Sequence, residues 1–285
     1  MNLKNKKILI TGGSGSLGRQ LIKELLGRKA ENIVSVSRDE GLIKEAEAEI
    51  NDRRVIWRVG NIADTESVKY LLKGIDFVYH TAAIKHVSLA EKYPREVLRI
   101  NIFGILNLLE QSQNVSRFIN ISSDKAIGVV NCYGASKLLG EYLVSETNNF
   151  FEGKFINIRC PNFLGSRGSV LDLWQRQIKK QNKIEITDPK MTRFFITLPD
   201  AAKFIVEKSL EDNLNPAKIY YPLEFTKKFH LDDLGKAFIE VFGDKKTEIK
   251  VIGAKTGEKT HEDYLTDVAF LSVKELVKLL RNLFS

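Results

Sequence analysis

Residues 11–18 of this chain read Thr11-Gly12-Gly13-Ser14-Gly15-Ser16-Leu17-Gly18, between a short β-branched run, Ile8–Thr11, and an amphipathic stretch, Leu17–Leu26. The glycines have the spacing G-x-x-G-x-x-G. The first permits a tight turn, the second lets a pyrophosphate approach the backbone, and the third lets helix pack on strand. Glycines alone are weak evidence, but this loop lies between a strand and a helix whose N-terminal amides can bind phosphate. The sequence therefore predicts a dinucleotide-binding loop that uses Thr11, Gly12, Ser14, Gly15, Ser16, Leu17 and Gly18.

Outward from this loop, short apolar runs alternate with longer amphipathic stretches. We expect further strands at Ile33–Val36, Val55–Val59, Phe77–Tyr79, Phe118–Ile121, Phe155–Arg159 and Lys218–Tyr221, and helices at Val97–Gln111, Ala135–Thr147, Leu198–Leu210 and Ser272–Leu283. Strands that are apolar on both faces and alternate with helices indicate a doubly wound parallel sheet. The sequence thus predicts a Rossmann-like α/β fold. We expect a cofactor domain in residues 1–162 that also uses 195–222, and a smaller interleaved lobe mainly in 163–285.

The composition is that of an ordinary globular protein, with 43% hydrophobic and 28% charged residues in 285. No apolar run is long enough to cross a bilayer and the N-terminus has no signal-peptide pattern, so we expect a cytoplasmic protein that binds no membrane. The formal charge is +8, but basic residues alternate with acids, so we expect a solvated basic surface rather than a nucleic-acid site. Two cysteines and four scattered histidines predict neither a disulfide framework nor a metal site.

The end of the second expected strand carries Ser37-Arg38, where an NAD enzyme usually places an acid against the ribose 2′-hydroxyl. A hydroxyl and a guanidinium suit a 2′-phosphate instead, which favours NADP, although Asp39 and Glu40 follow immediately. The adenine edge is expected at Asn61 and Ile62, after the third strand. The small residues Ala82 and Ala83, after the fourth strand, are expected where the dinucleotide passes.

The fifth expected strand ends in Ser122-Ser123-Asp124-Lys125, and Tyr133 and Lys137 follow on a helix. Residues at i and i+4 share one helical face. Lys137 could therefore hold the cofactor ribose and depress the pKa of Tyr133, which would allow the phenolate to act as a base. Such a pair occurs by chance in a lysine-rich chain, but its place after a serine-bearing fifth strand resembles the short-chain dehydrogenase/reductase superfamily.

A finer resemblance is to the inverting UDP-N-acetylglucosamine 4,6-dehydratases of polysaccharide and glycan synthesis. The similar blocks are Ser37–Glu40, Ala82–Val87, Ser122–Ala126, Asn131–Lys137, Gly165–Val170, Thr187–Phe194 and Gly257–Glu262. The resemblance implies that Tyr133 takes the proton of the C4 hydroxyl while Ser123 holds that oxygen. It further implies that a neutral Lys125 removes the C5 proton and a protonated Asp124 protonates the departing C6 hydroxyl, with inversion at C5.

The resemblance also implies substrate contacts at Lys85, Asn162, Arg193 and Lys255, and a cofactor contact at Lys85. A solvated loop position for Lys85 and structural roles for Asn162 and Arg193 stay open. Family members usually have Arg-Pro-Gly-Glu-Lys where this chain has Lys255-Thr256-Gly257-Glu258-Lys259, and a stretch before Phe270 is absent, so the lobe is shortened at the C-terminus. Family members suggest a homo-oligomer.

Two other functions compete with the dehydratase. A sugar-nucleotide 4-epimerase or reductase needs Tyr133 and Lys137 but has no use for Asp124 and Lys125, which would then form an ordinary ion pair. A non-catalytic NADP-binding regulator is the third alternative, although such proteins commonly lose the tyrosine–lysine pair.

Overall fold

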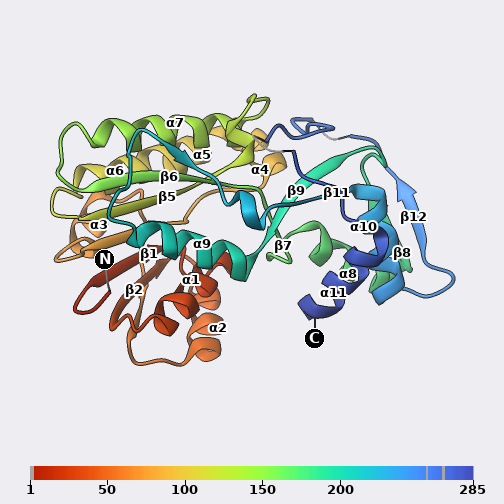
Figure 1. Ribbon diagram of the computed structural model, residues 1–285, viewed down its shortest axis with the longest axis horizontal. Helices are drawn as coiled ribbons and strands as arrows, with labels where there is room; N and C mark the ends of the chain where they lie inside the picture. Colours follow the sequence, from red (N-terminus) through yellow and green to blue (C-terminus); the bar gives the residue numbers. More distant parts are fainter. Residues whose placement is uncertain (1–2, 255, 265–266, 285) are drawn as a thin grey trace.

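The computed structural model describes residues 3–254, 256–264 and 267–284. Figure 1 shows a central sheet with helices on both sides. A smaller lobe lies beside one end of this sheet. The sheet has seven parallel strands in the order β10-β6-β5-β4-β1-β2-β3. These strands are β1 (Lys7–Thr11), β2 (Asn32–Ser37), β3 (Val55–Val59), β4 (Phe77–His80), β5 (Arg117–Ser123), β6 (Lys154–Cys160) and β10 (Ile219–Tyr220). The predicted Rossmann-like α/β class is confirmed.

The order of the strands in the sheet reverses between β1 and β4. The glycine loop follows β1 at this point. In open parallel sheets, ligands bind at the carboxyl ends of the strands beside such a switch point. The helices of this part are α1 (Ser16–Gly27), α2 (Glu40–Ile50), α3 (Thr65–Leu71), α4 (Val87–Lys92), α5 (Pro94–Val97), η1 (Leu98–Phe103), α6 (Gly104–Glu110), η2 (Asp124–Ala126), α7 (Cys132–Thr147) and α9 (Leu198–Leu210).

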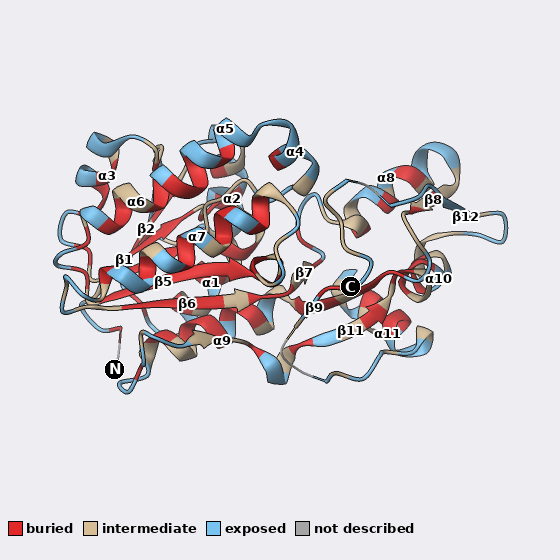
Figure 2. Ribbon diagram, turned by 90° about the horizontal axis from the view of Figure 1, so that it is seen from above, coloured by how far each residue is buried: buried red, intermediate tan, exposed pale blue. Residues whose placement is uncertain are grey.

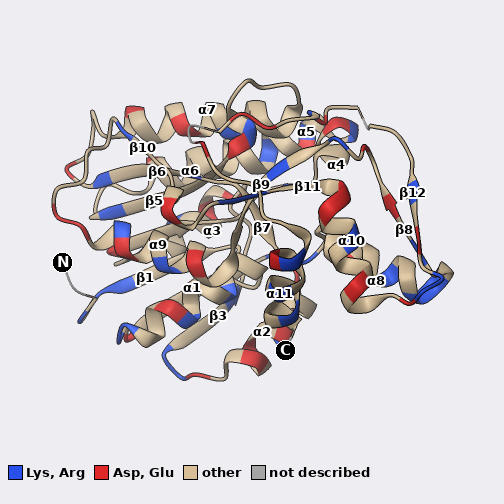
Figure 3. Ribbon diagram, turned by 45° about the vertical axis from the view of Figure 1, so that its right-hand side comes forward, with Lys and Arg blue, Asp and Glu red and all other residues tan. Residues whose placement is uncertain are grey.

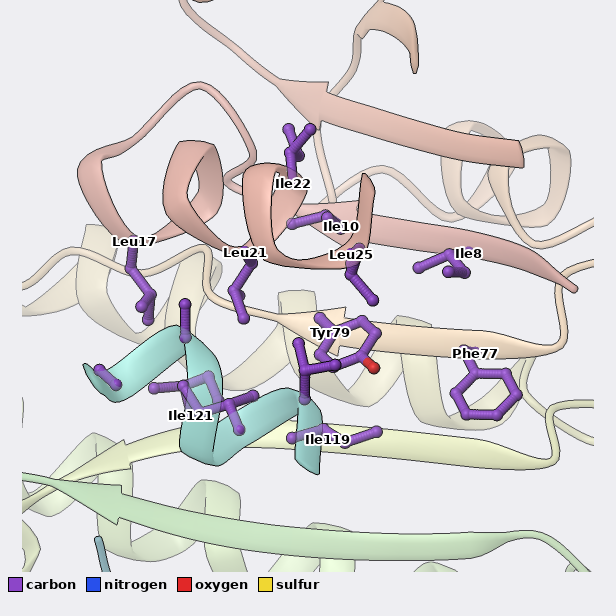
Figure 4. Packing of buried hydrophobic residues seen from close by; sticks show 14 of the residues in the cluster. Ile8, Ile10, Leu17, Leu21, Ile22, Leu25, Phe77, Tyr79, Ile119 and Ile121 are labelled. Atoms are coloured by element: carbon purple, nitrogen blue, oxygen red, sulfur yellow. The ribbon is translucent and has the colours of Figure 1, made fainter. Parts of the chain in front are cut away.

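The two faces of the sheet bury two separate hydrophobic cores, because successive strand residues point to opposite faces. Ile8 and Ile10 of β1 pack with α1 and α9, whereas Leu9 between them packs with α3, α6 and α7. Figure 4 shows the first core, where α1 side chains meet those of β1, β4 and β5. Both faces are therefore apolar, and Figure 2 shows β5 and β6 buried along most of their length.

The helix predicted over Val97–Gln111 is interrupted. A π-helical turn, η1, separates α5 from α6 and carries Asn101. The amide of Asn101 accepts a hydrogen bond from Ile84 N at 2.8 Å and donates to Ser136 Oγ at 2.9 Å. The wider turn thus ties the loop after β4 to α7, and π-helical turns are frequent near functional sites for this kind of reason.

Apart from its C-terminal helix, which was predicted over Ser272–Leu283, the lobe is built from segments to which the sequence assigned no element. A three-stranded sheet, β11-β9-β7, and a two-stranded sheet, β12-β8, pack with helices around Trp174 and Phe238. The elements are β7 (Asn162–Leu164), α8 (Val170–Gln181), β8 (Lys183–Ile186), β9 (Thr192–Thr197), η3 (Leu223–Phe225), β11 (Lys227–His230), α10 (Leu231–Phe242), β12 (Glu248–Val251) and α11 (Val273–Phe284). Because α9 and β10 return to the main sheet between β9 and β11, the lobe is interleaved. Figure 3 shows acidic and basic residues interspersed over both parts.

Candidate functional site

The glycine loop has the close approaches that its spacing predicted. Gly12 has a φ of +73°, and a Cβ atom there would lie 2.9 Å from the backbone nitrogen of Ala82. A Cβ atom on Gly18 would lie 2.5 Å from the carbonyl oxygen of Gly12, so only glycine lets α1 begin this close to the turn. Thr11, the last residue of β1, connects the start of the loop to β4, since its Oγ1 atom forms a hydrogen bond with His80 Nδ1 at 2.8 Å. These contacts hold the loop tightly between β1, β4 and α1, which is the compact turn that a pyrophosphate-binding loop requires.

The end of β2 leaves Arg38 available to a ligand. Arg38 is exposed and forms no ion pair with any residue that the structure describes, while Ser37 Oγ accepts a hydrogen bond from Ser14 N at 3.2 Å. The carboxylate of Asp39 caps α2 by accepting from Leu42 N at 3.0 Å. The acid that competed with the NADP interpretation thus has a structural role.

Several other residues expected at the cofactor have their side chains engaged within the protein. Asn61 Oδ1 accepts from Ala63 N in a local turn, and Ile62 is buried. Ser16 Oγ accepts from the backbone nitrogen of Arg167, in the loop after β7. Leu17 belongs to the hydrophobic core. The side-chain oxygen atoms of Asn61 and Ser16 thus each accept a hydrogen bond from the protein, while Ile62 and Leu17 are buried.

A cavity of about 420 Å³ lies between the glycine loop and the lobe. Ser14 and Ser16 line it on one side, and Arg167 and Leu171 line it on the other. Lys85 donates a hydrogen bond to the carbonyl oxygen of Arg167 at 2.9 Å, so it joins the loop after β4 to the lobe. The structure therefore places Lys85 against the lobe loop.

A compact polar cluster forms where β5 ends in η2. Asp124 is almost fully buried, and its Oδ1 atom accepts from Ser123 Oγ at 2.8 Å and from Lys125 Nζ at 3.2 Å. Lys125 Nζ also donates to Asn162 Oδ1 at 3.1 Å. The structure thus brings together Ser123, Asp124 and Lys125 and places beside them Asn162 of the first lobe strand, which the resemblance implied as a substrate contact.

Tyr133 faces this cluster from the first turn of α7. Asn131 caps the helix by accepting from Gly134 N at 2.7 Å, and a Cβ atom on Gly134 would clash with the carbonyl oxygen of Lys125. This close packing of α7 on η2 buries Tyr133. Burial raises the pKa of Tyr133, while the charge of Lys125 and a hydrogen bond with Ser123 oppose the increase. The sequence assigned the opposing charge to Lys137, but in the structure it comes from Lys125, because η2 folds against α7.

Lys137 lies one turn further along α7 and is also buried. Its amine makes no hydrogen bond to another described residue, and burial lowers the pKa of Lys137 to about 8. It borders a small cavity with His80, whose pKa burial lowers to about 3, so the imidazole is neutral. A buried amine without a partner can hold a ligand hydroxyl, which fits the role of binding a cofactor ribose.

The proton balance of Lys125 differs from the expected neutral amine. Burial alone would lower the pKa of Lys125, but the carboxylates of Asp124 and Glu262 outweigh burial and raise it. Asp124 and Lys125 therefore form an ion pair in this structure. Their contact at 3.2 Å is short enough for direct proton transfer, which would convert the ion pair into a neutral amine and a protonated acid.

The structure adds Glu262, which sequence reasoning did not single out. Its Oε1 atom lies 3.5 Å from Lys125 Nζ and 4.0 Å from Arg193 Nε. The only sequence signal was its place at the end of the block Gly257–Glu262. Arg193 bonds the carbonyl oxygens of Thr192 and Thr260, so it is built into the lobe beside the cluster. The predicted substrate residue Lys255 lies outside the described residues.

Among the described residues, no helix is long and apolar enough to span a membrane, and no cluster of histidine, cysteine or acidic side chains could hold a metal ion.

The sequence pattern of the family described as "Polysaccharide biosynthesis protein" matches residues 8–281. A UDP-N-acetylglucosamine 4,6-dehydratase (inverting) from Campylobacter jejuni is 36% identical over 90% of this chain and 76% of its own length. A UDP-glucose 4-epimerase from Rickettsia felis is 30% identical over 95% of this chain and 81% of its own length. The X-ray structure of Pen from Bacillus thuringiensis has a TM-score of 0.91 at 30% identity, over 99% of this chain and 100% of that chain.

Two longer relatives, polysaccharide biosynthesis proteins from Bacillus subtilis and Staphylococcus aureus, are matched over 45% of their length. The pattern match covers nearly the whole of this chain, and the relatives named above are 30–36% identical to it over most of its length. This chain therefore belongs to the polysaccharide biosynthesis protein family and is an enzyme of the extended short-chain dehydrogenase/reductase type.

Proposed function

We propose that this protein is an NADP-dependent 4,6-dehydratase that converts UDP-N-acetylglucosamine into a 4-keto-6-deoxy sugar with inversion at C5. The observation that carries the proposal is the contact of Asp124 with Lys125, directly beside Tyr133. An epimerase or a reductase needs the tyrosine alone for proton transfer at C4, whereas loss of water also needs a base at C5 and an acid at C6. The Campylobacter jejuni relative, named as such a dehydratase, supports this assignment.

The glycine loop, Arg38 and Lys137 would hold the cofactor, which supplies hydride transfer from C4 of the sugar and back to C6. Tyr133 would take the proton of the C4 hydroxyl, and Ser123 would hydrogen-bond the same oxygen. The resulting ketone acidifies the C5 hydrogen, so a neighbouring amine can remove it as a proton.

The ion pair at the site suggests how the acid and the base arise together. Transfer of one proton from Lys125 Nζ to Asp124 Oδ1 gives a neutral amine and a carboxylic acid. Lys125 then takes the C5 proton, and Asp124 gives its proton to the departing C6 hydroxyl, which leaves as water. These two transfers restore the ion pair. As hydride returns to C6, C5 takes a solvent-derived proton on the opposite face, which inverts this centre, and Tyr133 releases the C4 hydroxyl proton to solvent. We further propose that the lobe, with Asn162 and Arg193 at its border with this cluster, binds the nucleotide sugar.

The test is turnover of UDP-N-acetylglucosamine with NADP in deuterium oxide, with the product identified by NMR and mass spectrometry. We expect a 4-keto-6-deoxy product with one deuterium at C5 and no net change in NADPH absorbance. The same product made in light water should show the inverted configuration in its C5 proton couplings. Lys125→Ala should abolish water loss and C5 exchange, while Lys44→Ala, at an exposed lysine, should behave as wild type. Retention of configuration at C5 would refute the proposed inversion but not the proposed dehydratase activity.

A 4-epimerase is the second candidate, because the Rickettsia felis relative carries that name. The same experiment distinguishes it. An epimerized product that retains its C6 hydroxyl and is formed at equal rate by Lys125→Ala would replace the dehydratase proposal. Binding of NADP without turnover of any UDP-sugar would favour the non-catalytic alternative.

A further inference from the structure

The segment 257–264 returns from the lobe across the polar cluster. Asn131 Nδ2 donates to the carbonyl oxygen of Gly257 at 2.8 Å, and Lys259 Nζ donates to that of Ile127 at 2.9 Å. Tyr264 OH donates to the carbonyl oxygen of Arg159 at 3.0 Å. These contacts hold the segment against the loop that follows η2 and against the end of β6. The position of Glu262 between them is therefore fixed by the fold.

Glu262 is a buried carboxylate with few partners. Its side chain is 4% exposed, and its Oε2 atom is buried without a hydrogen-bond partner among the described residues. Its Oε1 atom faces Lys125 Nζ at 3.5 Å and Arg193 Nε at 4.0 Å. A buried charge is costly unless it is compensated. The compensation here comes from two cations, and the nearer one belongs to the proposed reaction site.

We propose that Glu262 is a positioning residue that holds the ammonium group of Lys125 and competes with Asp124 for its charge. The catalytic meaning of this inference rests on the proposed function, but the interaction itself does not. The groups that face Lys125 are Asp124 from η2, Glu262 from the segment, Tyr133 from α7, Arg193 from β9 and the neutral Asn162 from β7.

Two carboxylates within 3.5 Å of one ammonium group have opposite consequences for the dehydration step. Asp124 is the acceptor to which Lys125 must pass its proton. Glu262 stabilises the protonated amine and so opposes that transfer. Removing the charge of Glu262 should lower the proton affinity of Lys125, because an opposite charge that favours the protonated amine is lost.

The experiment measures the free-amine fraction of Lys125 without any substrate. Trace acetic anhydride competes for the lysines of the whole protein between pH 7.5 and 10, and mass spectrometry quantifies acetylation of the Lys125 peptide. Below its pKa, an amine gains about tenfold in reactivity per pH unit. In the wild type we expect this rise to continue through the range. In Glu262→Gln we expect at least tenfold more labelling at pH 8.5, and a plateau within the range.

The plateau distinguishes a change in the proton affinity of Lys125 from a change in the access of acetic anhydride to it. A change in access would multiply the labelling by the same factor at every pH and would produce no plateau. Asp263→Asn is the matched control, because it removes an adjacent, more exposed carboxylate whose partner is Lys259. It should leave the Lys125 curve unchanged. A Glu262→Gln curve that has the shape of the wild-type curve would overturn the proposal.

If Glu262→Gln does not fold, as judged by thermal melting, Glu262→Asp provides the test. The aspartate keeps the negative charge but places it one methylene group further from Lys125. Labelling of Lys125 in Glu262→Asp should therefore lie between that of the wild type and that expected for Glu262→Gln. Labelling identical to wild type would overturn the proposal. With active enzyme, the high-pH limb of kcat, where the Asp124–Lys125 pair loses its single proton, should move to lower pH in Glu262→Gln. Absence of any dehydratase product would remove the proposed function and leave the labelling result standing.

Discussion

The carboxylate of Glu141 accepts two hydrogen bonds from the guanidinium of Arg159, at 2.7 and 2.6 Å, in the buried space between α7 and β6. Arg159 Nη1 also donates to the hydroxyl of Tyr221 at 2.9 Å, beyond the sheet edge. Paired donors and acceptors of this kind fix orientation as well as distance. Because Tyr133 and Lys137 lie on the same helix as Glu141, this pair sets the register of α7 against the sheet and positions both residues.

Breaking this pair should be strongly destabilising. Glu141→Ala leaves the Arg159 guanidinium buried without its carboxylate, so we expect the free energy of unfolding to fall by roughly 3–5 kcal/mol. Urea denaturation at pH 7 measures it. In the double variant with Arg159→Ala, the second substitution should cost much less than it does alone. Additive losses would mean that the two side chains act separately.

Lys137 should lower the stability of the protein at neutral pH. Its pKa is about 8 in the folded chain and 10.5 ordinarily, because burial disfavours the charged amine. Below pH 8 both folded and unfolded states carry the proton, and the folded state bears the full cost. Lys137→Met should therefore raise the free energy of unfolding at pH 7 by about 3 kcal/mol, at about 1.4 kcal/mol per pKa unit.

The sign of the pH dependence follows from the same shift. Between pH 8 and 10.5 the unfolded state binds more protons at this lysine, so the stability of the wild type rises with pH relative to Lys137→Met. The advantage of the variant should shrink through this window and vanish above it. Chemical denaturation at pH 7, 8.5 and 9.5 checks the trend, and a constant difference would contradict it.

The sequence predicted the parts of the molecule that depend on local pattern. The glycine spacing fixed the loop between β1 and α1, and apolar runs marked the strands of the main sheet. The spacing of Tyr133 and Lys137 placed both on α7. Local pattern could not reveal Glu262, because its contact with Lys125 joins segments far apart in the chain. The strands of the lobe were equally hidden, since strands as short as β7 carry too few residues to show an alternation.

The sequence also left open how acids and cations near the site are paired. Asp39 follows Arg38 directly, and only the structure shows its carboxylate turned into the cap of α2. The π-helical turn at η1 interrupts a pattern that is amphipathic throughout, because the turn depends on the contact of Asn101 with the loop after β4. Such contacts are tertiary and override local propensity.

Two glycines of α1 provide a matched test of the phosphate loop. A Cβ atom on Gly18 would lie 2.5 Å from the carbonyl oxygen of Gly12, whereas one on Gly27 would meet nothing within 4 Å. Gly18→Ala should displace the start of α1 and weaken dinucleotide binding at least tenfold. Gly27→Ala should leave binding unchanged and increase stability by about 0.5–1 kcal/mol. Isothermal titration calorimetry measures dinucleotide binding by both variants, and urea denaturation measures their stability. Unchanged binding by Gly18→Ala would show that the loop tolerates a side chain at this position.

Arg38 should determine the choice between the two nicotinamide dinucleotides. It is exposed at the end of β2, close to Ser37 and the glycine loop, and the neighbouring acid Asp39 is occupied by the helix cap. A guanidinium at this place can form charge-assisted hydrogen bonds with a 2′-phosphate but gains little from a 2′-hydroxyl. Arg38→Ala should therefore weaken NADP binding by about 1.5–3 kcal/mol and leave NAD binding nearly unchanged.

Fluorescence titration with both dinucleotides measures this difference, and Arg95→Ala, at an exposed arginine on α5, is the control. Because the contact is between exposed charges, added salt should weaken NADP binding by the wild type more than NADP binding by Arg38→Ala. An equal loss of affinity for NADP and NAD would show that Arg38 supports the loop rather than the phosphate. Unchanged affinity for both would move the 2′-phosphate contact away from β2 altogether.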